Sequence, residues 1–245
     1  MLSCARDGDA YRLGFPGLAT FLVDDDGAIS CRPDPALPPG TLEHLLIDQV
    51  LPRVLTHRGY LVLHAGCVAS ARGAVAFLGD SGSGKSTLCA EFARAGHPLL
   101  GDDGIVVRRI AAAPGFDAIA TYPGLRLFPD PLAHVFDGRA GAAPVAHYSA
   151  KRRLDRHSAE LTLVAGALPL LALYVLDTDT SVTIEPLSER DAFMVLLRAS
   201  FQLHLEDRGA RAGSSNASAA CWTPFPCGGF RIRGISPASA PFAKP

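Results

Sequence analysis

A glycine-rich segment over residues 79–86 holds the clearest chemistry of the sequence. It reads Gly-Asp-Ser-Gly-Ser-Gly-Lys-Ser and matches the pattern G-x-x-x-x-G-K-[ST] in full. An apolar stretch precedes the segment, and the pattern after it predicts a helix over about residues 85–95. Glycines let the backbone bend until successive N–H groups point at one phosphate, and the helix N-terminus adds positive charge. The segment is therefore expected to bind a nucleotide.

Individual residues of this loop have separate expected roles in binding the nucleotide. Lys85 is expected to reach the β- and γ-phosphates, and the hydroxyl of Ser86 is expected to bind Mg²⁺. ATP and Mg²⁺ are therefore the predicted cofactors. The predicted nucleotide-binding residues are Gly79, Asp80, Ser81, Gly82, Ser83, Gly84, Lys85, Ser86 and Thr87.

Two adjacent carboxylates, Asp102 and Asp103, follow the next short apolar stretch. Beside a phosphate site, one carboxylate can contact Mg²⁺ and a second can accept a proton from an attacking hydroxyl or water. The alternative is an acidic turn before Gly104. His64 lies one predicted strand upstream of the loop, at the end of residues 61–63, and it is either an active-site residue or an ordinary core or surface histidine.

Composition limits the classes of function. The chain has 245 residues, of which 48% are hydrophobic and 19% are charged, enough for a sizeable core. The net charge of -1 gives no bulk attraction to nucleic acid or an acidic membrane, and residues 151–153 form the only clear basic cluster. No stretch suits a membrane-spanning helix, residues 1–11 lack an apolar signal-peptide core, and the six cysteines are scattered. We expect a cytoplasmic protein with neither nucleic-acid nor membrane partners.

The patterning predicts three regions. Residues 1–40 form an N-terminal β-rich lobe, with strands over 11–15, 19–23 and 28–31. Residues 41–208 form the catalytic α/β domain, which opens with a helix capped by Thr41, kinked at Pro52 and ended by Gly59. Later in this domain, residues 172–176 and 182–186 are expected to be paired strands. Residues 209–245 are rich in Ala, Gly, Ser and Pro and are expected to be an irregular tail, disordered or aberrant.

Residues 61–107 resemble the catalytic core of HPr kinase/phosphorylase. The resemblance lies in Leu-His-Ala-Gly, the Gly-Asp-Ser-Gly-Ser-Gly-Lys-Ser loop, Arg-Ala-Gly-His and the Asp-Asp pair. It implies an α/β P-loop kinase core of the HPr kinase/phosphoenolpyruvate carboxykinase type. It also implies that Asp103 is the catalytic base and His64 a second active-site residue, with Lys85 binding phosphate and Ser86 binding metal.

The rest of the chain resembles a shorter branch of that family, found with ribosomally made peptides and notably with lasso peptides. The segments that carry this resemblance are YRLGFPGLATF, LLIDQVLPRVLTHRGYLVLHA, TYPGLRLFPD and KRRL. Some members phosphorylate a serine of the precursor peptide. The resemblance implies a peptide or small-protein partner with an acceptor serine, and a homo-oligomer is an open expectation because HPr kinases are hexamers.

The sequence departs from the family in two places. Residues 121–126 lack the glutamate of the family's E-x-R-G motif, so metal binding is expected to depend on Ser86 and Asp102, and phosphorolysis is disfavoured. Arg126 could instead pair with phosphate through its planar guanidinium, or it could be a surface arginine on a strand. Lys151 is likewise expected either to pair with phosphate or to be a surface residue. The second departure is the tail, because relatives continue with a helix and a strand.

The sequence therefore predicts a serine kinase that transfers the γ-phosphoryl group of ATP to a peptide or small protein. Its proposed catalytic residues are Asp103, His64, Lys85 and Arg126. One alternative is a kinase that acts on a small-molecule hydroxyl. Another is a regulator or inactive relative that only binds ATP, which the presence of both carboxylates with His64 argues against. A transporter-type ATPase is disfavoured because no signature motif follows the loop.

Overall fold

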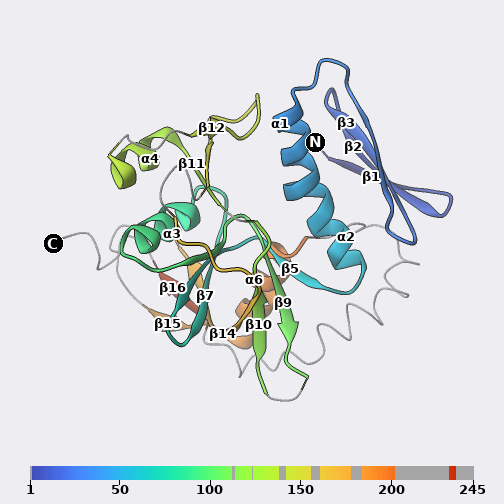
Figure 1. The fold of residues 1–245 in the computed structure, drawn as a ribbon. Coiled ribbons are helices and arrows are strands. Elements are labelled where there is room, and N and C mark those ends of the chain that lie inside the picture. The colour runs from blue at the N-terminus through green and yellow to red at the C-terminus, as the bar shows by residue number, and fades with distance from the viewer. Residues whose placement is uncertain are drawn as a thin grey trace.

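The fold is described from a computed structural model of the chain. The described residues are 2–111, 114–122, 124–137, 142–155, 161–177 and 184–201, together with the backbone of 232–235. Within them the chain combines sheets with a few short helices, which confirms the mixed α/β class (Figure 1). In this part of the chain, no helix combines the length and apolarity needed to cross a membrane.

The first strands form a separate antiparallel sheet. Strands β1 (Ser3–Asp7), β2 (Ala10–Phe15), β3 (Ala19–Asp24) and β4 (Ile29–Pro33) pair in sequence order. Apolar residues alternate along β2 and β3, so one face of the sheet is buried. That face packs on the helical segment that follows, through Tyr11, Leu13, Phe21, Val23, Leu45, Val50 and Val54.

The helical segment is interrupted by a π-helix. It consists of α1 (Pro39–Leu45), the π-helix η1 (Leu46–Val50) and α2 (Leu51–His57). The prediction that Thr41 caps this segment is wrong. Pro39 occupies the first turn, where its fixed φ favours the helix, and Thr41 is buried with its Oγ1 accepting from His147 N at 3.1 Å. A π-helix ends just before α2, and the kink expected at Pro52 stays a prediction.

The main sheet has nine strands. Its path runs β5-β9-β10-β14-β7-β6-β8, with β16 pairing both β14 and β15. Only the β14–β7 and β14–β16 pairs are parallel among the ladders of the described residues. The strands are β5 (Leu61–Leu63), β6 (Gly66–Ser70), β7 (Gly73–Leu78), β8 (Leu99–Gly101), β9 (Ile105–Arg109), β10 (Phe116–Ile119), β14 (Ala167–Leu176), β15 (Glu185–Pro186) and β16 (Ile232–Ile235).

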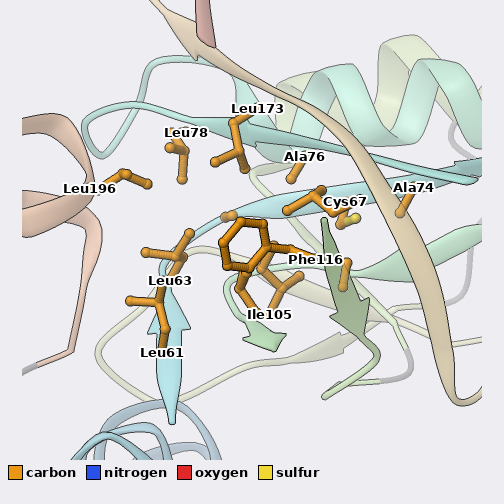
Figure 2. Close-up of a cluster of buried hydrophobic side chains, with 14 of the residues drawn as sticks. Leu61, Leu63, Cys67, Ala74, Ala76, Leu78, Ile105, Phe116, Leu173 and Leu196 are labelled. Carbon is orange, nitrogen blue, oxygen red and sulfur yellow. The ribbon is translucent and has the colours of Figure 1, made fainter. Parts of the chain in front are cut away.

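Helices bury both faces of this sheet. On one face, Cys89 and Ala90 of α3 (Lys85–Arg94) pack with Phe77 of β7. On the other, Leu196 of α6 (Glu189–Ala199) packs with Leu78, the next residue along β7. Figure 2 shows this second cluster, with the Phe116 ring near its centre and side chains from several strands around it. A strand buried on both faces explains the unbroken apolar run before the glycine loop.

A small sheet lies beside α3. It is formed by β11 (Leu125–Leu127), β13 (Arg152–Leu154) and β12 (Ala143–Pro144), and α4 (Pro129–Phe136) follows β11 (Figure 1). Leu125, Leu127 and Val135 pack into the same cluster as α3. This sheet brings residues 125–127 next to α3, the helix that follows the loop, and residues 152–154 pair with them.

The predicted pairing of residues 172–176 with 182–186 is wrong. Strand β16, from the region expected to be an irregular tail, pairs with β14 on one side and β15 on the other. Residues 178–183 and the rest of the tail lie outside the described residues. The domain boundaries at 40 and 208 stay predictions.

The sheet core gives the first testable prediction. Leu173 is 0% exposed at the centre of β14, whereas Leu171 on the same strand is 40% exposed. Leu173→Ala should lower the free energy of unfolding by roughly 2–5 kcal/mol, because it leaves a cavity between sheet and helix. Leu171→Ala is the matched control and should cost no more than about 1 kcal/mol. Equal losses in urea titrations of both variants would contradict this description of the core.

Candidate active site

The glycine loop joins β7 to α3. Strand β7 ends at Leu78 and α3 begins at Lys85, so the loop leads directly into a helix N-terminus. Gly79, Gly82 and Gly84 have φ angles of 143°, 86° and 94°, which L-residues rarely adopt. A Cβ on Gly79 would also lie 2.6 Å from Ser83 Oγ and 3.0 Å from Leu176 O. The glycines are therefore required by the bend itself.

The Lys85 side chain is hydrogen-bonded to the main chain of this loop. Its Nζ donates to the carbonyl oxygens of Gly79 at 2.8 Å and Asp80 at 2.9 Å. Burial lowers the pKa of Lys85, and the carboxylates of Asp103 and Asp102 oppose that shift. Both partners of the ammonium are neutral carbonyls, so an anionic oxygen would be a stronger partner.

The other predicted loop residues lie in different environments. Asp80 and Ser81 are exposed, as is Gly82, while Thr87 is half-buried on the first turn of α3. Ser83 Oγ is buried and has no hydrogen-bond partner among the described residues. The structure thus places one unsatisfied hydroxyl inside the loop, beside exposed backbone.

Asp102 is turned toward the start of α3. Its Oδ1 accepts from Ser86 Oγ at 2.9 Å and its Oδ2 accepts from the backbone N–H of Arg126 at 2.9 Å. Burial, reinforced by the charge of Asp103, raises the pKa of Asp102 to about 7. Gly66 leaves room for Cys89 of α3 beside this carboxylate, since a Cβ there would lie 2.5 Å from Cys89 Sγ.

Asp103 has the opposite surroundings. Its φ of 64° is the left-handed conformation, rare for a residue other than glycine and frequent at functional sites. Its Oδ2 lies 3.2 Å from Arg126 Nη1, and its Oδ1 lies 3.7 Å from Lys151 Nζ and 4.0 Å from His64 Nε2. Burial alone would raise the pKa of Asp103, but these cationic groups outweigh burial and the pKa lies below its usual value.

His64 contacts the same turn. Its Nδ1 lies 3.0 Å from the main-chain oxygen of Asp103, within hydrogen-bond distance, and its side chain is 39% exposed. Partial burial lowers the pKa of His64 although the Asp103 carboxylate opposes the shift. A hydrogen bond at Nδ1 requires that nitrogen to carry the proton, which leaves Nε2 of a neutral imidazole facing the carboxylate side.

Arg126 links this turn to the N-terminal helical segment. Its side chain is 1% exposed, so it is not a surface arginine. The guanidinium pairs with Asp103 and, through Nη2 at 2.7 Å, with Asp48 Oδ1 in η1. The guanidinium carbon, Cζ, also lies 3.7 Å from the centre of the Tyr122 ring, which is a cation–π contact.

Sequence reasoning missed Asp48. This aspartate is buried in the π-helix, where it pairs with Arg126 and His44. The sequence feature that pointed to a buried acid was the position of Asp48, three residues after Leu45, which is buried. π-Helical turns occur frequently at functional sites, but they leave no mark in the sequence that identifies a partner.

A pocket lies beside Asp103. Its volume is about 240 Å³ and its lining is mainly apolar. The residues around it come from the helical segment, from β5 and β9, and from residues 120–122. They are Ile47, Asp48, Leu51, Pro52, Leu55, Val62, Asp102, Asp103, Gly104, Val106, Ala120, Thr121 and Tyr122.

The structure therefore brings Asp103, His64 and Arg126 into one cluster with Lys151, and joins Asp102 to Ser86. The charge of Asp103 also acts on Lys85, so the loop and this cluster form one site. Within the described residues, no group of three or more His, Cys, Asp or Glu side chains is arranged to hold a metal ion.

The comparisons with known proteins match this chain to solved structures only. No protein-family model matches the sequence, and no curated protein matches it either. Among solved structures, the chain is similar to the Hpr(Ser) kinase/phosphatase from Coxiella burnetii, with 14% sequence identity and a TM-score of 0.36. The similarity covers 52% of this chain and 72% of that one. A similarity at this level carries no argument about chemistry, and the lasso-peptide resemblance stays a prediction.

The Arg126 ion pairs give the second prediction. Arg126→Met should lower the free energy of unfolding by about 3–5 kcal/mol, because Asp48 and Asp103 lose their buried cation. Adding Asp48→Asn should restore part of that loss, so the double variant should be more stable than the sum of the two single changes predicts.

Arg108→Met is the matched control. This arginine pairs with Asp117 at 3.2 Å on the surface and is 55% exposed, so its loss should cost about 1 kcal/mol or less. Strictly additive effects of Asp48→Asn and Arg126→Met in urea unfolding would show that the two side chains do not act as a pair.

Proposed function

We propose that this protein is a kinase that transfers the γ-phosphoryl group of ATP to a serine hydroxyl of a peptide or small protein. The observation that carries the proposal is the opposite orientation of two adjacent carboxylates. Asp102 is hydrogen-bonded to Ser86 at the start of the loop helix, while Asp103 pairs with Arg126 and Lys151, and both carboxylates line the pocket. One turn thus connects a candidate phosphate site with a candidate acceptor site.

A nucleotide fits the loop. Gly79, Gly82 and Gly84 adopt the conformations that a tight loop around a phosphate requires, and α3 directs its N-terminus there. Lys85 is held only by two main-chain carbonyls, which a phosphate oxygen could replace. The unsatisfied Ser83 Oγ is a further donor at this place.

Magnesium fits the pair of Ser86 and Asp102. A hydroxyl and a carboxylate are oxygen ligands of the kind that Mg²⁺ prefers, and Mg²⁺ commonly takes one or two protein ligands with substrate phosphates. The raised pKa of Asp102, about 7, reflects burial beside Asp103 without a neighbouring ion, and a divalent cation would favour its ionised form. When bound, Mg²⁺ would neutralise charge on the phosphates.

The chain's own residues account for the transfer. The surrounding cations keep Asp103 ionised, so its carboxylate can accept the hydroxyl proton as the acceptor oxygen bonds to the γ-phosphorus. The bond from that phosphorus to the β–γ bridging oxygen breaks, and ADP leaves. Lys85 and the loop N–H groups stabilise the charge on the phosphoryl oxygens. His64 holds the Asp103 turn through the main-chain oxygen.

The choice of a peptide serine rests on the sequence resemblance. A small-molecule hydroxyl would use the same base and the same loop, so an acceptor screen has to separate the two. Free serine and seryl peptides, each incubated with labelled ATP, make that comparison. A peptide kinase should ignore the free amino acid.

The loop lysine gives the third prediction. Lys85→Met should weaken ATP binding roughly tenfold to a hundredfold, the value of a hydrogen bond to a charged group. Calorimetric titration with ATP measures this directly, before any turnover. An unchanged dissociation constant would mean that the loop does not hold the nucleotide.

The carboxylate at 103 gives the fourth prediction. Asp103→Asn should slow phosphoryl transfer by roughly 10²–10⁴-fold while ATP affinity stays near that of the wild type. Asparagine is suited to the test because it tolerates the left-handed backbone, so the change removes the charge and spares the turn. Asp117→Asn, at the surface pair with Arg108, should leave the rate unchanged. Near-wild-type turnover of Asp103→Asn would reject Asp103 as the base.

A further inference from the structure

We infer that the pocket beside Asp103 receives the acceptor, and that it takes an uncharged apolar group directly next to the reacting hydroxyl. This inference rests on the proposed function, because it assumes that Asp103 accepts the hydroxyl proton. It goes further by naming the chemistry that would distinguish a good acceptor from a poor one.

The walls of the pocket are the first argument. Most of the lining is aliphatic and comes from the helical segment, β5, β9 and the residue after β10: Ile47, Leu51, Pro52, Leu55, Val62, Val106 and Ala120. An apolar ligand group gains free energy by leaving water for such walls. A sugar or polyol would instead lose hydrogen bonds to water that these residues cannot replace.

The polar groups of the lining are the second argument, because Asp48, Asp102 and the Thr121 hydroxyl already have partners. Asp48 pairs with Arg126, and Thr121 Oγ1 donates to Gly104 O at 2.6 Å. The Tyr122 ring lies against the Arg126 guanidinium. Asp102 accepts from Ser86 and from the main chain. Asp103 remains as the group with a chemical task, and one ligand hydroxyl satisfies it.

Size is the third argument. A protein cavity of about 150 Å³ admits benzene, so the 240 Å³ here accommodates a ring or a branched side chain with an adjoining hydroxyl. Pockets for whole drug-sized ligands begin at roughly 300 Å³. The pocket thus suits one side chain of a larger acceptor.

Charge is the fourth argument. Three aspartates, at 48, 102 and 103, are among the described residues that line the pocket, whereas no lysine or arginine is. An acidic group on the acceptor would meet like charge in an apolar space, which disfavours it strongly. The expected acceptor therefore carries an apolar residue, and no acidic one, beside its serine.

The first experiment measures binding without turnover. Benzyl alcohol, which places a hydroxyl next to a ring, should bind the full chain in ligand-observed NMR, and glycerol should not. Ala120→Leu fills the half-buried wall of the pocket and should abolish the benzyl alcohol signal. Ala133→Leu makes the same change at an exposed position of α4 and should bind like the wild type.

Leu55→Ala is a second pocket variant, which tests the pocket independently if Ala120→Leu fails to fold. It removes apolar wall and should weaken benzyl alcohol binding several-fold, whereas thermal unfolding reports whether each variant is folded. Wild-type binding in both folded pocket variants, or no benzyl alcohol binding to the wild type, would overturn the inference.

The second experiment measures selectivity. Peptides that differ only beside one serine, with Leu, Gly or Asp there, should be phosphorylated in that order of kcat/KM, with Leu roughly tenfold or more above Asp. Ala120→Leu should remove the preference for Leu over Gly while its ATP affinity stays that of the wild type. An unchanged Leu-to-Gly ratio in this variant would overturn the inference.

The two proposals fail differently. Benzyl alcohol binding that Ala120→Leu abolishes, without transfer to any peptide or to benzyl alcohol itself, would support the pocket and reject the kinase. Transfer that requires Asp103 but is indifferent to the neighbouring residue would support the kinase and reject the pocket. Transfer to benzyl alcohol with none to the peptides would reject the peptide acceptor.

Discussion

The site depends on one constraint: the adjacent carboxylates of Asp102 and Asp103 are both buried, so each needs partners that offset the loss of water and the repulsion between them. Removing an ionised carboxylate from water costs several kcal/mol unless partners replace the water, and a second charge next door adds to that cost. The left-handed backbone of Asp103 separates the pair. Asp102 then relies on hydrogen bonds from Ser86 and a main-chain N–H, while Asp103 relies on the cations Arg126 and Lys151.

Distant parts of the chain contribute to this solution. Arg126 on β11 serves both carboxylates, since its main-chain N–H reaches Asp102 and its guanidinium reaches Asp103. The same guanidinium pairs with Asp48 of the N-terminal helical segment, so that segment is tied to the site as well as to its own sheet. A lysine could not replace this arginine, because a single ammonium lacks the planar fork that addresses two carboxylates at once.

Short-range sequence patterns predicted the glycine loop and its surroundings, because these depend on residues that are close together in the chain. The loop, the helix after it and the strands around it follow from glycine spacing and apolar runs, and the Asp102–Asp103 pair was visible directly. Asp48 was not predicted, because its partner Arg126 is far away in sequence and only the tertiary fold brings them together. Strand β16 was missed for the same reason: a short stretch in a Gly/Ser-rich region becomes a strand by pairing with β14.

The positions of the two carboxylates also explain why the site needs both a polar and an apolar side. Toward the loop, the open groups are donors: Lys85, the backbone of a tight turn and a helix N-terminus. Toward the pocket, the open surface is aliphatic and its polar atoms are largely paired within the chain. In the proposed reaction, the nucleotide phosphates would find donors on the loop side, and an apolar group of the acceptor would find aliphatic walls on the pocket side. Two ligands of opposite character can therefore meet at Asp103 in one orientation, without a further element to direct them.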